Sequence, residues 1–376
     1  MSSLPAFMAR ALAQAEKALL ISSPNPRVGC VLTDAHGQVL GEGHTQRAGG
    51  PHAEVMALRD AQANGHSVVG ATAWVTLEPC SHHGRTGPCC DALIAAGIGR
   101  VVAAISDPNP RVAGQGFERM RAAGVQVDVG AGAQESRELN LGFFSRMVRG
   151  TPWVRVKAAA SLDGHTALPN GSSQWITSEA ARADGHAWRA RAGALLTGVG
   201  TVLADNPRLD VRLDQNATDL PRQPALVVVD SQLRTPPEAR IFDAERPVWI
   251  YTAQQDAGRA AALAARGASV QCLPDAQGRV DLAALLADLG RREVNELHVE
   301  AGHVLNGALM RAGLVDEWLV YLAPKLIGAG AGLAREPFEG GPLTTLANAA
   351  TLEFRSVAQL GPDLRIVARG LGRDRF

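Results

Sequence analysis

The sequence is poor in lysine, in aromatic residues and in net charge. Lysine contributes only three of the 37 basic residues, at Lys17, Lys157 and Lys325, and the formal net charge is zero. Aromatic residues make up 4% of the chain. Nucleic-acid-binding domains carry basic surfaces interleaved with aromatic side chains, so a nucleic-acid partner is not expected.

Long apolar runs are also absent. None approaches the roughly 20 residues that cross a bilayer, and the stretch from Met1 to Leu20 mixes charged and apolar residues at helical spacing, unlike a signal peptide. We therefore expect an amphipathic first helix, a cytoplasmic location and no membrane partner. The 376 residues exceed what one compact core usually holds, which predicts two domains.

Cysteine is scarce, and its distribution is uneven. The five cysteines are an odd number in a long chain, so a disulfide framework is not expected. Cys80, Cys89 and Cys90 nevertheless lie close together in the sequence. Such clustering in a cytosolic chain indicates a metal site or catalysis.

The pattern of strands and helices alternates along both halves of the chain. In the first half it predicts a hairpin at 28–33 and 38–44 and helices at 54–64 and 134–147. Gly150, Thr151 and Pro152 interrupt the pattern before a new strand at 153–160. We expect two α/β domains, residues 1–147 and residues 152–376.

Three residues in the first half have the chemistry of zinc ligands. His52 opens a predicted helix, Cys80 follows after 27 residues, and Cys89 follows after eight more. One imidazole and two thiolates leave the fourth tetrahedral position of Zn²⁺ open for water, as in catalytic zinc sites.

Glu54 completes this pattern. It lies two residues after His52 on the same predicted helix, and it can move protons without binding the metal. The order H-x-E, then P-C and a second cysteine, is typical of zinc nucleobase deaminases. A structural zinc with His82, His83 or Cys90 as fourth ligand is the alternative, but it leaves Glu54 without a role.

The second half contains weaker signals. Gly198-Val199-Gly200 follows a predicted strand, and helix N-termini bind phosphate, but the motif lacks a third glycine. The residues alone therefore predict only an α/β domain with turns that suit phosphate.

The motifs together resemble the bifunctional deaminase–reductases of riboflavin biosynthesis, the RibD family. In the first half the resemblance rests on 52–54, 76–80, 82–89, 25–29, 41–44 and 107–112. In the second half it rests on Lys157, 161–164, 173–177, 201–207, 299–302 and 323–326. It implies a cytidine-deaminase-like three-layer αβα domain followed by a dihydrofolate-reductase-like α/β domain.

The resemblance also implies two reactions on one pyrimidine nucleotide. The first domain would hydrolyse the 2-amino group of 2,5-diamino-6-(5-phosphoribosylamino)pyrimidin-4-one, using Zn²⁺. The second would reduce the ribosyl group to ribityl, using NADPH. Asn25 and Arg85 are weaker candidates for contacts with the substrate in the first domain. A homo-oligomer is implied as well.

Residue by residue, the resemblance assigns the second site. The residues expected to bind NADPH are Ala159, Trp175, Thr201, Asp205, Ser231 and the turn formed by Gly302, His303, Val304, Leu305, Asn306, Gly307 and Ala308. Those expected to face the sugar phosphate are Ser173, Leu209, Arg212 and Glu300. The alternative function is a zinc deaminase of a nucleic-acid base with a non-catalytic second domain.

Overall fold

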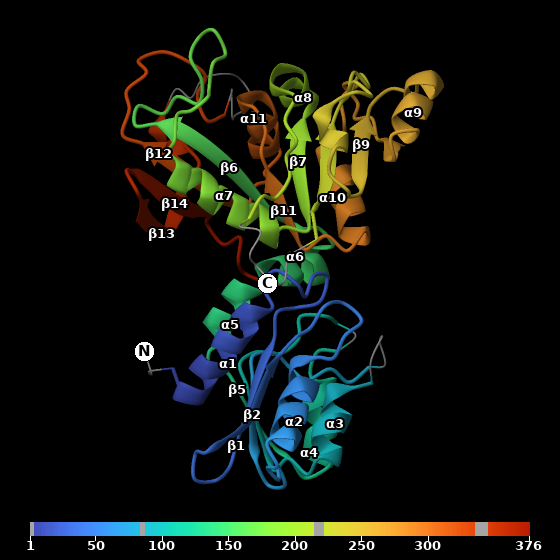
Figure 1. Ribbon diagram of the computed structural model, residues 1–376, viewed down its shortest axis with the longest axis vertical. Coiled ribbons are helices and arrows are strands. Elements are labelled where there is room, and N and C mark those ends of the chain that lie inside the picture. Colours follow the sequence, from blue (N-terminus) through green and yellow to red (C-terminus); the bar gives the residue numbers. More distant parts are fainter. Residues whose placement is uncertain (1–3, 83–86, 111, 214–221, 335–344) are drawn as a thin grey trace. The chain divides into compact units, whose positions relative to one another are not determined.

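The chain forms two compact units. The computed structural model describes residues 4–82, 87–110, 112–213, 222–334 and 345–376. Residues 1–150 together with Phe376 make the first unit, and residues 151–375 make the second. Each unit is built on one β-sheet (Figure 1). Among the described residues, no helix is both long and apolar enough to span a bilayer.

The first unit is a five-stranded sheet between two helical layers, with the order β2-β1-β3-β4-β5. Strand β1 is antiparallel to β2 and β3, whereas β3, β4 and β5 run parallel. Its strands are β1 (Gly29–Thr33), β2 (Val39–His44), β3 (Thr72–Val75), β4 (Arg100–Ala103) and β5 (Gln126–Val129). Its helices are α1 (Ala6–Lys17), α2 (Ala53–Ala63), α3 (Cys89–Ala95), α4 (Gln115–Ala122), α5 (Ala133–Leu139) and α6 (Leu141–Arg149).

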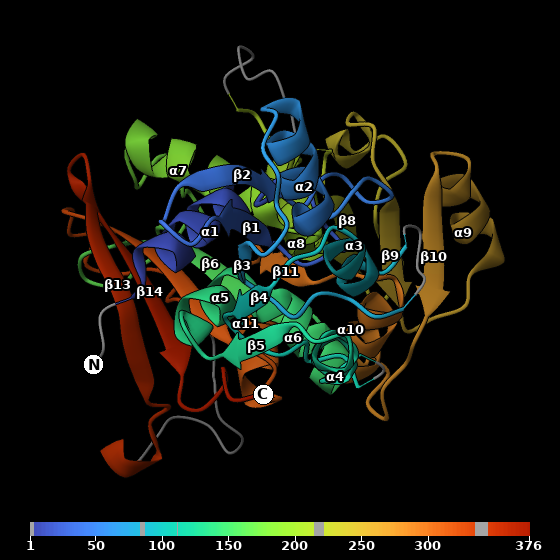
Figure 2. The same cartoon turned by 90° about the horizontal axis from the view of Figure 1, so that it is seen from below.

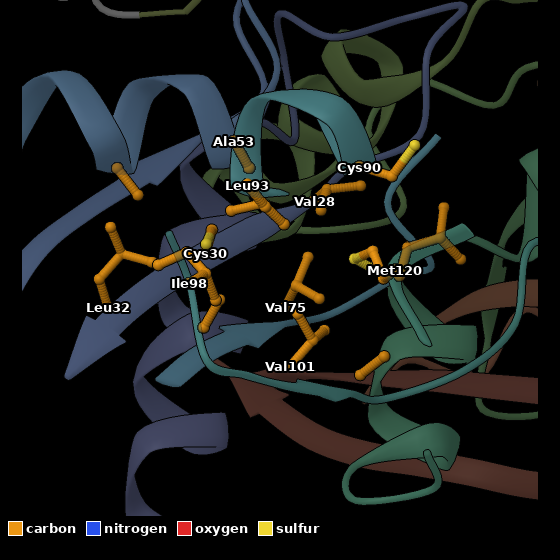
Figure 3. Close-up of a cluster of buried hydrophobic side chains, with 14 of the residues drawn as sticks. Val28, Cys30, Leu32, Ala53, Val75, Cys90, Leu93, Ile98, Val101 and Met120 are labelled. Carbon is orange, nitrogen blue, oxygen red and sulfur yellow. The ribbon is translucent and has the colours of Figure 1, made fainter. Parts of the chain in front are cut away.

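Alternating side chains of β1 explain the three layers. Cys30 and Leu32 point into the core shared with α2, α3 and α4 (Figure 3). Val31 points to the opposite face, where it packs with Met8 of α1. Figure 1 shows α2, α3 and α4 on one side of the sheet and α1 and α5 on the other. The expected three-layer αβα architecture is therefore confirmed.

The second unit is a nine-stranded mixed sheet with the order β10-β9-β8-β7-β11-β6-β12-β14-β13. The strands from β10 to β12 are parallel, and β14 and β13 add an antiparallel edge. Figure 2 shows β13 and β14 at one edge of the sheet and β10 at the other. The strands are β6 (Trp153–Ser161), β7 (Ala194–Gly198), β8 (Ala225–Val229), β9 (Val248–Thr252), β10 (Ala268–Cys272), β11 (Glu296–Val299), β12 (Glu317–Ala323), β13 (Leu352–Leu360) and β14 (Asp363–Gly370).

Helices cover both faces of this second sheet, because its central strands are apolar on both sides. On β7, Leu196 packs with α10 and α11, whereas its neighbour Leu195 packs with α8 and α9. The helices are α7 (Glu179–Arg191), α8 (Val199–Asp205), α9 (Ala257–Ala264), α10 (Leu282–Arg291) and α11 (His303–Arg311), with short 3₁₀ turns η1 (Arg240–Phe242) and η2 (Leu346–Asn348). The expected second α/β domain is confirmed.

One expected helix is wrong. Residues 134–147 form two helices, α5 and α6, instead of one, and the break falls at Asn140. The Asn140 side chain accepts a hydrogen bond from the Arg27 backbone N–H and donates to the Arg27 and Ser136 carbonyls. These contacts hold Asn140 away from helical geometry and connect the helices to the segment before β1.

Candidate active sites

The three predicted zinc ligands converge in the first unit. His52 lies just before α2, Cys80 lies in the loop after β3, and Cys89 is the first residue of α3. The His52 Nδ1 atom lies 3.6 Å from the Cys80 sulfur and 3.3 Å from the Cys89 sulfur. The ligand atoms of the three residues all lie within 4.8 Å of one another.

Close packing of α2 on β2 positions His52. A Cβ atom on Gly41 would lie 2.4 Å from the Ala57 carbonyl oxygen, and one on Gly43 would lie 2.5 Å from the Met56 Cβ. Only glycine at these two places lets the helix approach the strand so closely. The 41–44 motif therefore fixes the depth of the helix that begins after His52.

The spacing of the three atoms suits a tetrahedral zinc ion. Ligands bound at about 2.0–2.3 Å to one tetrahedral centre lie roughly 3.5 Å apart, as His52 does from both sulfurs. Within the described residues no fourth His, Cys, Asp or Glu joins the cluster. Cys90 is buried and contacts Asp91 instead. His82 is not part of the cluster, and His83 lies outside the described residues.

Glu54 lies beside these ligands on the first turn of α2 and is only 3% exposed. Burial raises the pKa of its carboxyl to about 7, and negative charge on Cys80 adds to the effect. A bound Zn²⁺ would oppose this by favouring the carboxylate. A carboxyl that titrates near neutral pH beside a metal site has the properties of a proton carrier.

A hydrogen bond links the thiols of Cys80 and Cys89. The Cys80 sulfur accepts hydrogen bonds from the Cys89 thiol and from its backbone N–H, which lies 3.4 Å away. This contact, together with His52, holds the pKa of the Cys80 thiol well below its ordinary value, although burial acts against it. These contacts favour the thiolate of Cys80, the form that binds metal.

Glu78 supports the site, and the sequence analysis did not single it out. Its buried carboxylate accepts hydrogen bonds from the backbone N–H groups of Asp107, Gly114 and Gly116, at 3.1, 2.9 and 2.9 Å. It thereby fastens the loop before α4 to the segment that carries Cys80. The 107–112 motif contains one of its partners, Asp107, but the two residues are 29 positions apart, so the sequence alone does not predict that they are in contact.

Of the two weaker substrate candidates in the first unit, only Asn25 is among the described residues. Asn25 forms a turn with Ser22, whose carbonyl accepts the Asn25 backbone N–H at 2.8 Å. Arg85 lies outside the described residues.

The second unit contains a pocket of about 1810 Å³. This exceeds the roughly 300–1,000 Å³ of a site for one drug-sized ligand, so a dinucleotide and a second ligand can share it. All of the residues predicted for this site except Gly307 line the pocket: Ala159, Ser173, Trp175, Thr201, Asp205, Leu209, Arg212, Ser231, Glu300, Gly302, His303, Val304, Leu305, Asn306 and Ala308. Gly307 is buried within α11.

The turn before α11 has the features of a phosphate-binding helix N-terminus. Gly302 is the N-cap of the helix, and a Cβ atom built on it would meet nothing within 4 Å. The first N–H groups of a helix lack partners within it and favour anions. The residues therefore fit the phosphates of a dinucleotide.

Glu300 belongs to a charged group that the sequence analysis did not identify. Arg189 of α7 donates to both Glu300 oxygens, and its Nη2–Oε2 distance is 2.9 Å. The Lys157 ammonium lies 3.8 Å from the same carboxylate. Burial alone would raise the pKa of Glu300, but these two cations outweigh it and hold the pKa well below its ordinary value. Arg189 and Glu300 are 111 residues apart, which no local motif reveals.

Two family models match the chain. The cytidine and deoxycytidylate deaminase zinc-binding region matches residues 1–105, and the RibD C-terminal domain matches residues 152–366. The chain is thus a zinc-binding deaminase domain joined to a reductase domain.

Full-length relatives define this class further. The riboflavin biosynthesis protein RibD of Escherichia coli K12 is 48% identical over 95% of this chain and 97% of its own length. The Haemophilus influenzae protein of the same name is 41% identical over 96% and 95%.

Solved structures agree with these matches. Acinetobacter baumannii RibD superposes with a TM-score of 0.87 at 38% identity, covering 97% of this chain and 98% of that one. A Thermotoga maritima diaminohydroxyphosphoribosylaminopyrimidine deaminase/5-amino-6-(5-phosphoribosylamino)uracil reductase superposes at 0.84 with 32% identity, covering 97% of each chain. The chain belongs to the RibD family, the bifunctional deaminase–reductases of riboflavin biosynthesis, whose cofactors are Zn²⁺ and NADPH.

Proposed function

We propose that residues 1–147 hydrolyse the 2-amino group of 2,5-diamino-6-(5-phosphoribosylamino)pyrimidin-4-one. The observation that carries this proposal is the tetrahedral spacing of His52, Cys80 and Cys89 beside the buried Glu54. Zinc bound by these three side chains would supply a Lewis acid that lowers the pKa of a water molecule to roughly 7.

Glu54 is the proton carrier in this proposal. It accepts a proton from the water that attacks the ring carbon bearing the 2-amino group. It then delivers a proton to that amino group, the carbon–nitrogen bond breaks, and ammonia leaves. Burial favours the protonated form of Glu54 and bound Zn²⁺ would favour its carboxylate, so opposing influences act on the group that both accepts and releases the proton.

We propose further that residues 152–376 reduce the ribosyl group of the deaminated product to ribityl. When bound, NADPH would supply hydride for C1′ of the imine that forms when the sugar opens, and solvent would supply the proton that the imine nitrogen gains. Glu300, Arg212, Ser173 and Leu209 hold the sugar phosphate. The cofactor contacts are assigned to Ala159, Trp175, Thr201, Asp205, Ser231 and the turn from Gly302 to Ala308, of which Gly307 is buried and does not line the pocket.

We propose that the partners of this protein are small molecules and not nucleic acid, and that it is a cytoplasmic homo-oligomer. The zero net charge and the scarcity of lysine support the first statement. A filter-binding titration with tRNA at moderate salt tests whether the protein binds nucleic acid. Light scattering of the purified protein measures its oligomeric state.

The experiment supplies the diaminopyrimidine nucleotide and NADPH, and it follows ammonia release and NADPH absorbance in parallel. Glu54→Gln is expected to lower ammonia release by about 10²–10⁴-fold, while reduction of added deaminated intermediate continues. Glu118→Gln, which changes an exposed carboxylate of the same domain, is the control. Deamination by Glu54→Gln at the wild-type rate would refute the assignment of the proton carrier.

A further inference from the structure

One end of the reductase pocket has an arginine that no proposed contact uses. Arg234 is exposed and lines the pocket. In the described part of the chain its guanidinium forms no hydrogen bond or ion pair, unlike Arg189 and Arg212, which pair with Glu300 and Asp210. A cation that lines a ligand pocket without a protein partner is available to an anion.

The strand order shows which part of a dinucleotide lies at this end. Strands β6, β11, β7 and β8 are consecutive and parallel, so their carboxyl ends lie along one edge of the sheet. Lys157 lies on β6, and Glu300, which is proposed to hold the sugar phosphate, directly follows β11. Neighbouring strands lie about 4.8 Å apart, so the three steps from β6 to β8 span roughly 14 Å.

The proposed phosphate turn before α11 lies between these two ends. Hydride transfer requires the nicotinamide near Glu300, and the pyrophosphate follows at α11. The remaining adenosine half must therefore extend past β7 to the turn after β8. This turn contains Ser231, to which dinucleotide binding was already assigned, and Arg234.

The turn after β8 is rigid. The fully buried Asp230 accepts hydrogen bonds from the backbone N–H and the hydroxyl of Thr235, both at 2.7 Å. Between them Leu233 is buried and has a left-handed backbone, with φ of 52°. A non-glycine residue in this conformation costs about 1 kcal/mol or more and persists only where the surroundings impose it. The backbone that carries Arg234 is therefore held in one conformation.

A second turn adds another arginine at the same place. The Ser231 hydroxyl oxygen accepts the backbone N–H of Val280 at 3.1 Å, which joins the turn after β8 to the turn that contains Arg279. Arg279 also lines the pocket, and it pairs with Asp275 at 3.5 Å. The adenosine end of the pocket thus carries two arginines on turns that are joined to each other.

We propose that Arg234, assisted by Arg279, binds the 2′-phosphate of NADPH and makes the reductase select NADPH over NADH. The inference rests on the proposed dinucleotide site. A phosphomonoester is the one group that distinguishes the two cofactors, and the guanidinium donates paired hydrogen bonds to phosphate. The ribose of NADH offers only hydroxyl groups, which gain little from a cation.

The test measures dissociation constants of the zinc-loaded full-length protein for NADPH and NADH by titration calorimetry. Arg234→Ala is expected to weaken NADPH binding by about tenfold, as for loss of one charge-assisted contact, and to leave NADH binding unchanged. Arg279→Ala is expected to have a smaller effect in the same direction. Arg291→Ala, which changes an exposed arginine outside the pocket, is the control and should alter neither.

A second probe isolates the adenosine end. Adenosine 2′,5′-bisphosphate should lose affinity in Arg234→Ala as NADPH does, and AMP should not. If Arg234→Ala loses the same affinity for NADPH as for NADH, or loses affinity for neither, the inference is overturned, but the proposed dinucleotide site still stands. Failure of the wild-type protein to bind either dinucleotide would instead refute the proposed reductase function, and this inference with it.

Discussion

The two candidate sites hold their ligands in opposite ways. The deaminase site is a small cluster of side chains, in which three ligand atoms lie within 4.8 Å and a carboxyl lies buried beside them. The reductase site is a pocket of about 1810 Å³, lined by the ends of many strands and by backbone turns. The comparison teaches that metal chemistry is concentrated in a few residue types, whereas cofactor binding is distributed over the fold.

Two glutamates show the same contrast in electrostatics. Burial raises the pKa of Glu54 to about 7, and the neighbouring Cys80 thiolate adds to the shift. Glu300 is also buried, but Arg189 and Lys157 hold its pKa well below the ordinary value. Burial favours uptake of a proton by the first carboxyl, whereas the second remains charged and can only bind or orient.

The largest expected effect is that removal of zinc abolishes deamination and leaves reduction unchanged. Dialysis against a zinc chelator should lower deamination by at least about 10³-fold, because Glu54 accepts the proton of the water but does not lower the pKa of that water as a metal ion does. NADPH-dependent reduction of the deaminated intermediate should continue in the same sample. Readdition of Zn²⁺ should restore ammonia release. Parallel loss of both activities would show that the two sites are not independent, and the contrast between them would fail.

A smaller effect concerns the loop that supports the metal site. Glu78→Ala removes the acceptor of three backbone N–H groups, and leaving the buried N–H groups of Asp107 and Gly116 without an acceptor costs about 1–3 kcal/mol each. We expect hydrogen exchange at Asp107, Gly114 and Gly116 to accelerate by about two orders of magnitude or more, and zinc to dissociate faster.

Glu78→Gln provides the matched variant for this prediction. Its amide oxygen can keep one or two of the three hydrogen bonds, so the acceleration should be clearly smaller. NADPH affinity should not change in either variant. If exchange in the 107–116 segment is unaffected by Glu78→Ala, the carboxylate does not hold this loop.

The contrast also explains how much the sequence predicts. His52 and Glu54 share one helical turn, and Cys80 and Cys89 flank one loop, so the residue types and their spacing predicted a cluster that the structure brings together. The depth of α2 depends on Gly41 and Gly43, which the motifs contained but whose packing role required coordinates.

The reductase site was accessible only through resemblance. The contact between Arg189 and Glu300 joins α7 to the end of β11, and the turn containing Arg234 depends on Asp230 and a buried Leu233. Neither has a local sequence pattern. The edge strand β10 was also missed, although its Ala268, Val270 and Cys272 alternate with Ser269 and Gln271 as in a half-buried strand.

The smallest of these effects concerns how Arg189 orients Glu300 in the reductase site. Arg189→Lys keeps the positive charge but loses the planar fork, which contacts both Glu300 oxygens and the Asp210 carbonyl at 2.9 Å. We expect KM for the deaminated sugar phosphate to rise by about tenfold, with the dissociation constant of NADPH unchanged. Arg191→Lys is the control on the same helix, because Arg191 pairs with Glu296 and does not line the pocket. If Arg189→Lys binds the substrate as the wild type does, charge alone orients Glu300, and the reductase site depends less on exact side-chain geometry than the metal cluster does.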